Sequence, residues 1–350
     1  MLQQNRFILP LIITTASTAF AGEVTTEGSD ITIKLNGPVE FKTADGDYSA
    51  KLGGRIQWDY NYAELNGDTE EDEFDIRRAR IYLSGKAHDW SYKLQFNIGD
   101  DNGGTHEDLY IQYNGWGKKA VVTVGNQKEP FGLEELHSSK DMSFLERSGV
   151  SDGYAPGRGE GVLFHGSQDA FTYAIGVFED DSAGDDAAVT GRVTYSPYET
   201  DNSVVHLGAA YTDRAANVDA FGLEAAYVHG PYHLQAEYFS GDFDGTDADG
   251  FYLQAGWVIT GEVRPYSGGI FKRITAEESS GAWEVVLRYD DGDGDWGDQE
   301  LGDTDATGYG IGVNYYLNKL IRVGASYTWA EDNLSTDDGS EFRARLQIAL

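Results

Sequence analysis

The chain has 350 residues, no cysteine and a formal net charge of −33. The lack of cysteine excludes a disulfide framework and a thiolate metal site, and the acidic excess argues against nucleic acid as a partner because such a surface repels phosphate. Beyond the N-terminus no run of about 18 apolar residues occurs, so helical membrane spans are not expected.

The first 21 residues have the features of an export signal. Arg6 supplies a thin basic region, residues 7–16 are largely apolar, and residues 19–21 (Ala-Phe-Ala) fit the small-x-small cleavage pattern. The alternative is a buried N-terminal helix. We expect residues 1–21 to be a signal peptide. A short periplasmic N-terminal segment should follow over residues 22–50, with strand-like pieces at 31–35 and 39–42.

Apolar and polar residues then alternate along repeated segments to the end of the chain. The last segment reads FRARLQIAL, with apolar residues at every second position from Phe342 to Leu350. Such period-two alternation gives a strand one apolar and one polar face. Fifteen segments show it, at residues 51–63, 78–87, 90–98, 109–113, 120–124, 171–177, 189–195, 205–211, 221–227, 232–238, 251–259, 283–289, 309–315, 321–329 and 342–350. Residues 160–167 form a weaker strand whose facing the pattern does not fix, which brings the count to sixteen.

The apolar faces carry no charged residue, and aromatic residues cluster at their ends. A charge facing lipid costs about 2–4 kcal/mol near the membrane midplane, and aromatic girdles are typical of outer-membrane barrels. Lipid also leaves no strand edge unpaired, so the last strand should close on the first. We therefore predict an all-β fold, a transmembrane antiparallel β-barrel of 16 strands over residues 51–350. The alternative is a soluble two-sheet sandwich.

The connections alternate between short turns and long loops, as expected for periplasmic and outer ends. One exception is residues 261–281, a long connection where a short turn is expected, and the sequence assigns it no role. The acidic outer loops are predicted at residues 64–73, 100–108, 180–186, 242–249, 290–305 and 331–338.

The longest outer connection, residues 127–159, differs from the others in composition. It carries apolar residues such as Phe131, Phe144 and Leu145, and it mixes basic with acidic residues. A loop with apolar anchors and balanced charge is expected to pack, and we predict that this third outer loop folds into the barrel and narrows the lumen. The alternative is an outer lid with no role in permeation. The candidate constriction residues are Lys128, Glu134, Glu135, Lys140, Arg147 and Arg158.

Four segments carry a resemblance to a known family: EPFGLEELHSSKDMSFLERS at 129–148, KLGGRIQWD at 51–59, RRARIYLSG at 77–85 and FRARLQ at 342–347. Together they resemble the phosphate-selective porin O/P family, from about residue 40 to the end of the chain. The resemblance implies a trimeric channel in the outer membrane of a Gram-negative bacterium, with the third outer loop folded inward. It also implies passage of anions along a ladder of arginines.

Basic residues gather on the polar faces of five segments that become neighbours when the barrel closes. Such a wall admits small anions and orients dipolar solutes. We predict that Glu134 and Glu135 of the third outer loop face it. The alternative is chance, because any polar lumen carries charges. The predicted basic wall comprises Arg55, Arg78, Arg80, Lys93, Arg322, Arg343 and Arg345.

These patterns favour a passive diffusion porin for small hydrophilic solutes, mainly anions such as phosphate or other oxyanions. The alternative is a structural or receptor barrel whose acidic outer loops bind an external partner. An enzyme is not expected, because none of the seven histidines lies in a recognisable motif with Ser and Asp or Asn.

No cofactor or metal site is predicted. The aspartate-rich stretch 290–305 lacks the ligand spacing of a calcium loop. The acidic loops are expected to be solvated, and the alternative is that divalent cations bridge them to lipopolysaccharide.

Overall fold

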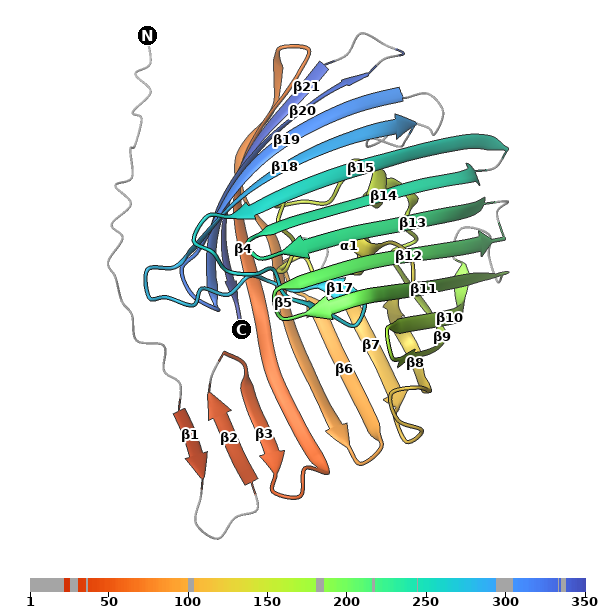
Figure 1. The fold of residues 1–350 in the computed structure, drawn as a ribbon, viewed down its shortest axis with the longest axis vertical. Helices are drawn as coiled ribbons and strands as arrows, with labels where there is room; N and C mark the ends of the chain where they lie inside the picture. Colours follow the sequence, from red (N-terminus) through yellow and green to blue (C-terminus); the bar gives the residue numbers. More distant parts are fainter. Residues whose placement is uncertain are drawn as a thin grey trace.

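Figure 1 shows the computed structural model of the chain, a barrel of strands with a small sheet beside one end of it. The structure describes residues 22–25, 31–35, 37–99, 104–180, 186–215, 218–243, 245–293, 305–332, 334 and 338–350. The predicted signal peptide, residues 1–21, lies outside the described residues. Within these ranges, the structure contains no helix that is both long and apolar enough to cross a membrane.

Sixteen strands form the barrel, each antiparallel to its neighbours. Strand β21 closes it on β4, from Gly339 opposite Leu65 to Ala349 opposite Arg55. The predicted sixteen-stranded barrel, closed by its terminal strand, is confirmed. Its strands are β4 (Tyr48–Leu65), β5 (Asp68–Ala87), β6 (Trp90–Asn97), β7 (Thr105–Tyr113), β8 (Val121–Lys128), β9 (Arg158–Gln168), β10 (Phe171–Asp180), β11 (Asp186–Thr200), β12 (Ser203–Arg214), β13 (Val218–His229), β14 (Tyr232–Phe243), β15 (Thr246–Val258), β18 (Ala282–Asp293), β19 (Asp305–Tyr316), β20 (Ile321–Asp332) and β21 (Asp338–Ala349).

The direction of the side chains follows the alternation in the sequence. On β4, Ile56 and Trp58 are exposed on the outer surface, whereas Gln57 and Asp59 are buried. Successive side chains of a strand point to opposite faces of the sheet. The apolar set therefore faces outward, where lipid lies, and the polar set faces the lumen.

The outer ends of two hairpins differ from the prediction. Residues 64–73, predicted as a loop, belong almost entirely to β4 and β5, which join through Asn66 and Gly67. Both have positive φ, 54° and 84°, as a two-residue hairpin turn requires. Strands β14 and β15 likewise include most of residues 242–249. The prediction was wrong here because apolar alternation stops where lipid stops, whereas backbone pairing continues into water. The predicted loops 100–108, 180–186, 290–305 and 331–338 lie partly outside the described residues.

Ahead of the barrel, a three-stranded extension consists of β1 (Gly22–Thr25), β2 (Ile31–Leu35) and β3 (Val39–Thr43). Strand β3 pairs with the start of β4, so the extension lies beside the lower end of that strand in Figure 1. The two predicted strand-like pieces are confirmed as β2 and β3. The first barrel strand begins at Tyr48, three residues before the predicted boundary at residue 51.

Two connections pack against the inner side chains of the barrel. The first, residues 129–157, joins β8 to β9 and contains α1 (Leu133–Leu136) and α2 (Gly149–Tyr154); we call it the long loop. The second, residues 261–281, lies between β15 and β18 and contains β16 (Tyr266–Ser267) and β17 (Ile270–Phe271); we call it the insert. Apolar clusters form where they meet the wall, among them Phe131 with Phe239, and Leu133 with Phe271.

Candidate functional site

The long loop is bound to inner side chains from many strands. Arg322 donates hydrogen bonds to the carbonyl oxygens of Met142 (2.6 Å) and Ser143 (2.9 Å). Arg345 donates to the carbonyl oxygen of Leu145 (2.6 Å). These bonds satisfy carbonyl groups that an irregular segment leaves without ladder partners. Other wall residues that bind the loop are Gln57, Thr190, Arg214, Glu237, Glu284, Asn314 and Gln347.

A buried carboxylate holds the start of α1. Glu237 on β14 accepts hydrogen bonds from the backbone N–H groups of Leu133 and Glu134, the latter at 2.8 Å. The hydroxyl of Tyr252 donates to the same carboxylate at 2.6 Å. The first N–H groups of a helix have no partner within it, so a carboxylate at this position satisfies them. Glu237 therefore ties the long loop to the wall.

The insert packs against both the long loop and the wall. Arg264 donates to the side-chain oxygen of Gln235 (2.7 Å), and its guanidinium lies 4.4 Å from the ring centroid of Phe271. The N–H of Phe271 donates to Nε2 of His137 in the long loop (3.1 Å). Burial holds the pKa of His137 well below 6.5, so its ring is neutral and free to accept this bond. The sequence assigned no role to the insert. In the structure it binds the long loop and helps to hold it in place.

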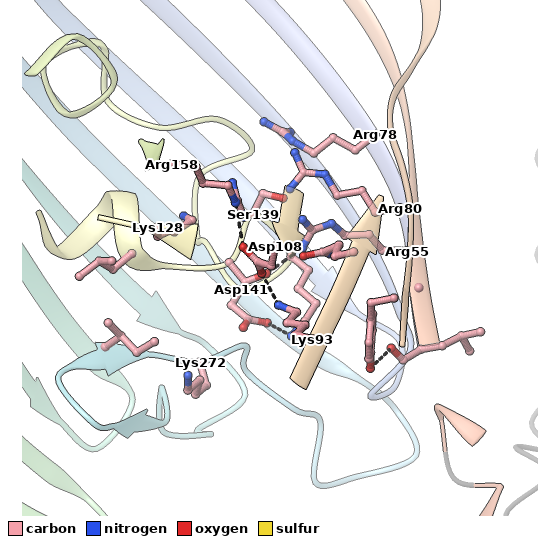
Figure 2. Close-up of a pocket in the computed structure, with 18 of the residues that line it drawn as sticks. Arg55, Arg78, Arg80, Lys93, Asp108, Lys128, Ser139, Asp141, Arg158 and Lys272 are labelled. Carbon is pink, nitrogen blue, oxygen red and sulfur yellow. Dashed lines mark hydrogen bonds and ion pairs between the residues drawn. The ribbon is translucent and has the colours of Figure 1, made fainter. Parts of the chain in front are cut away.

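Between the long loop and strands β4 to β9 lies a cavity of about 340 Å³. In Figure 2, Arg78, Arg80 and Arg55 lie one below another along the wall, with Lys128 and Arg158 on the opposite side of the view. Residues from the strands, the long loop and the insert all contribute to its lining. The charged lining residues are Arg55, Arg78, Arg80, Lys93, Asp108, Lys128, Lys140, Asp141, Arg147, Arg158 and Lys272.

Most cations of the cavity are paired, but they share carboxylates. Asp108, for example, binds both Arg158 (2.8 Å) and Lys93 (2.5 Å). One negative charge that serves two cations leaves a net positive charge. The pairs around the cavity are Arg80–Glu107, Arg158–Glu107, Arg158–Asp108, Lys93–Asp108, Lys128–Glu135, Arg147–Glu135 and Lys140–Asp141.

Arg55 differs from these cations. It donates to the hydroxyl of Ser138 (2.7 Å), and no carboxylate of the described chain lies within ion-pair distance of it. Its Nε and that of Arg80 are buried and have no hydrogen-bond acceptor in the described structure. A buried charged donor without an acceptor costs free energy. Arg55 therefore adds a positive charge to the cavity lining that no ion pair within the described chain offsets.

Glu146 of the long loop lies among four arginines. Its carboxylate oxygens are 2.8 Å from Arg78, 2.5 Å from Arg345, 3.3 Å from Arg77 and 3.5 Å from Arg343. Burial by itself would raise the pKa of Glu146, but the hydrogen bonds and positive charge of these arginines outweigh it and hold the pKa well below the usual range. Glu146 is therefore ionised and acts as a fixed anion beside the cavity.

Three residues of the predicted basic wall do not line this cavity. Arg322 is 2% exposed and is bound to the backbone of the long loop. Arg343 and Arg345 hold the buried carboxylate of Asp59 at 3.1 and 2.5 Å. All three side chains are buried inside the barrel and contact the long loop, so they anchor structure. The other four predicted residues, Arg55, Arg78, Arg80 and Lys93, do line the cavity.

The two predicted acidic residues of the constriction do not face the wall. Glu134 accepts a hydrogen bond from the N–H of Ser148 within the long loop (2.9 Å). Glu135 pairs with Lys128 and Arg147, each at 2.9 Å. The prediction is wrong because the turn of α1 directs both side chains toward the long loop itself and the adjoining end of β8, and Glu146 contacts the basic wall instead. The four predicted basic residues, Lys128, Lys140, Arg147 and Arg158, all line the cavity.

Sequence reasoning missed several lining residues. Ser138 and Asp141 lie in the segment that carries the family resemblance, which marks the region without identifying the side chains. Lys272 belongs to the insert, and no pattern in the sequence places it in the lumen. The described residues include no group of histidines and acids arranged to hold a metal ion.

Comparison with known proteins identifies the family. The family described as Phosphate-selective porin O and P matches residues 50–215 and 211–350. The chain belongs to this family. It is 31% identical to Porin O of Pseudomonas aeruginosa, over 96% of each chain. An uncharacterised protein of Caulobacter vibrioides is 26% identical over 74% of this chain and 64% of the relative. The predicted family is confirmed, and the chain is an outer-membrane porin of a Gram-negative bacterium, not an enzyme.

Solved structures show the same fold at low sequence identity. The anion-selective porin from Comamonas acidovorans matches this porin with a TM-score of 0.63 at 15% identity, covering 87% of this chain and 100% of the other. The outer membrane channel DcaP of Acinetobacter baumannii matches with a TM-score of 0.57 at 13% identity, covering 89% and 99%. These likenesses concern the barrel alone.

Proposed function

We propose that this porin conducts small anions, in particular oxyanions such as phosphate, through the basic cavity. One observation carries the proposal: five arginines and four lysines line the cavity, against two aspartates. The relatives support it, since the family is described as phosphate-selective and the porin from Comamonas acidovorans as anion-selective. In this proposal the long loop is the inward-folded constriction.

Two opposed fields act on a solute that approaches the pore. The chain as a whole is strongly acidic, with a formal charge of −33, and acids gather in the outer connections. The Debye length is about 8 Å at physiological ionic strength, so charges in open water are strongly screened. Charges in a narrow cavity are screened less. The basic cavity therefore sets the selectivity at moderate salt, and the acidic mouth weakens it at low salt.

The reversal potential in a salt gradient across planar bilayers tests this proposal. The wild-type channel should be anion-selective, and Arg55→Gln should move its reversal potential toward zero, because the change removes a cavity charge that has no carboxylate partner. Lys119→Gln, in an exposed turn outside the cavity, should leave the potential unchanged. A wild-type channel that is cation-selective at moderate salt would refute anion conduction. The absence of ion conductance would favour the receptor barrel.

The selectivity should also depend on pH in the alkaline range. Burial lowers the pKa of Lys140 and Lys272 below their usual 10.5. Raising the pH therefore neutralises both before an exposed lysine, and anion selectivity should fall before the pH reaches the usual lysine pKa of 10.5. The double variant Lys140→Arg with Lys272→Arg should keep more of its anion selectivity than the wild type as the pH rises, because arginine stays charged where lysine is neutralised. Reversal potentials that are flat with pH in the wild type would show that neither lysine faces the conducting path.

We further propose the assembly and setting of the porin. Residues 1–21 direct export, residues 22–50 lie on the periplasmic side, and three copies form a trimer. N-terminal sequencing of the membrane-inserted protein and its mass in mild detergent test the leader and the trimer.

Divalent cations bridge the acidic outer connections to lipopolysaccharide, since acids and lipid phosphates repel each other without them. Chelator should then reduce the lipopolysaccharide that co-purifies.

A further inference from the structure

A second cavity lies inside the barrel, beside the basic cavity that Arg55 and Arg78 line. Its volume is about 460 Å³, comparable with the 340 Å³ of the basic cavity. Residues of β8 to β11, the β7–β8 turn, the long loop and the insert contribute to its lining. We call it the side cavity.

The tip of the insert separates the two cavities. Arg192 on β11 donates a hydrogen bond to the carbonyl oxygen of Gly269 (2.9 Å), and the N–H of Phe271 donates to His137 in the long loop (3.1 Å). The tip is therefore attached both to the wall of the barrel and to the long loop. Gly268 on one side of it lines the side cavity, and Ile270 on the other side lines the basic cavity.

The two cavities meet at Lys128, which lines both of them. Its amino group donates to the carbonyl oxygen of His137 (3.1 Å) and pairs with Glu135 (2.9 Å). Because His137 is also the residue that binds the insert, Lys128 lies directly beside the partition. In Figure 2 it lies above Lys272 of the insert. A solute that reaches Lys128 therefore has a cavity on either side of the insert.

Each cavity reaches the short-turn end of the barrel at a different place. The basic cavity extends to Tyr82 and Leu350, where the N–H of Leu350 donates to the carbonyl oxygen of Gly54 at the β21–β4 seam. The side cavity extends to Asn114 and Lys118 in the β7–β8 turn. Short turns mark the periplasmic rim of such barrels. The two cavities thus lead toward the same compartment along different strands.

The lining of the side cavity suits an anion. It contains Lys118, Lys128 and Arg192 and, among the described residues, no carboxylate. Arg192 pairs with Glu224 (2.6 Å), so its charge is offset, whereas Lys118 is exposed at the rim. Positive charges and polar groups along a pore replace part of the water that a permeating ion loses.

We propose that the conducting path forks at Lys128 and that the side cavity is a second exit, through which anions reach the periplasm in parallel with the basic cavity. The insert is the divider between the two branches. The fork rests on the proposed function, since it concerns the route of the anions that the porin conducts.

Single-cysteine variants test the fork, because the chain contains no cysteine. Ser167→Cys places a thiol in the side cavity, and Tyr82→Cys places one at the end of the basic cavity. A methanethiosulfonate reagent that carries a sulfonate adds a negative charge at each thiol. Conductance is measured in planar bilayers before and after the reaction, and mass spectrometry measures the extent of labelling. Asp89→Cys, in an exposed turn outside both cavities, is the matched control and should conduct equally before and after.

Labelling either cavity should remove about half of the conductance, because two branches of similar volume carry similar currents and the sulfonate repels anions from one of them. In the double variant the two decreases should add, since parallel conductances add. Along a single path the added resistances would sum instead, and the double variant would lose less than the two decreases together. That result would overturn the fork.

Three further results at position 167 would also overturn it. A thiol that does not react would show that the side cavity is closed to solvent. An unchanged current after complete labelling would make the cavity a dead end, and complete loss of current would make it the sole exit. The reversal potentials of the unlabelled variants test anion conduction separately, so failure of the fork is distinguishable from failure of the proposed function. Thr172→Cys on β10 repeats the measurement if Ser167→Cys does not fold.

Discussion

Glu146→Gln should make the channel more strongly anion-selective and should tighten the binding of permeating anions. Glu146 is a fixed negative charge among Arg77, Arg78, Arg343 and Arg345. An anion in the cavity is repelled by this carboxylate and must compete with it for Arg78. Removing the charge releases Arg78 toward the cavity that it lines.

The expected size of this effect follows from Coulomb's law. At an effective dielectric constant of about 20, a unit charge about 8 Å from a bound anion contributes about 2 kcal/mol. That corresponds to an increase of more than tenfold in anion affinity. The same substitution weakens the hydrogen bonds that the arginines make to residue 146. The long loop is then held less firmly, at a cost of about 1–3 kcal/mol in stability, and this reduces the gain in anion affinity.

Block of chloride current by added phosphate measures the affinity, and the reversal potential measures the selectivity. Glu341→Gln is the matched control, since Glu341 also pairs with Arg343 (2.8 Å) but at a more exposed position outside the cavity. This control should shift the reversal potential much less. Equal effects of the two variants would mean that the negative charge acts through the general field of the lumen and that Glu146 does not compete for the anion site.

Glu237→Ala should release the long loop and give a larger, unstable conductance. The carboxylate of Glu237 accepts hydrogen bonds from the N–H groups of Leu133 and Glu134 and from the hydroxyl of Tyr252. Each buried donor left without a partner costs about 1–3 kcal/mol. The loss of two bonds to α1 should therefore raise the population of the detached loop by roughly 30-fold or more.

Single-channel recording checks this prediction, with current fluctuations and mean conductance both expected to rise. The barrel ladder is untouched, so the electrophoretic shift between heated and unheated protein should remain. Tyr252→Phe is the control: it removes a donor to Glu237 but keeps both bonds to α1, and it should conduct like the wild type. A quiet, wild-type conductance in Glu237→Ala would place the main attachment of the long loop at its other contacts, such as Arg322 and Arg345.

The sequence by itself determined the barrel and the facing of its side chains. Facing is a local property, because successive side chains of a strand point to opposite sides whatever the rest of the chain does. The alternation therefore placed Arg55, Arg78 and Arg322 in the lumen, as the structure shows. Closure also followed, because lipid leaves no strand edge unpaired. The alternation did not predict where the strands end, because it marks only the part of each strand that faces lipid. Strands β4 and β5 stay paired beyond that part.

Only the tertiary structure decided which inward charges remain open to a solute. Arg55 and Arg322 look alike in the sequence, yet the long loop covers Arg322 and leaves Arg55 at the cavity. Arg345 meets Glu146, a residue 199 positions away in the chain, and no local pattern specifies that contact. Electrostatic energy depends on distance and burial. The charge that a permeating ion meets is therefore set by where the long loop and the insert pack.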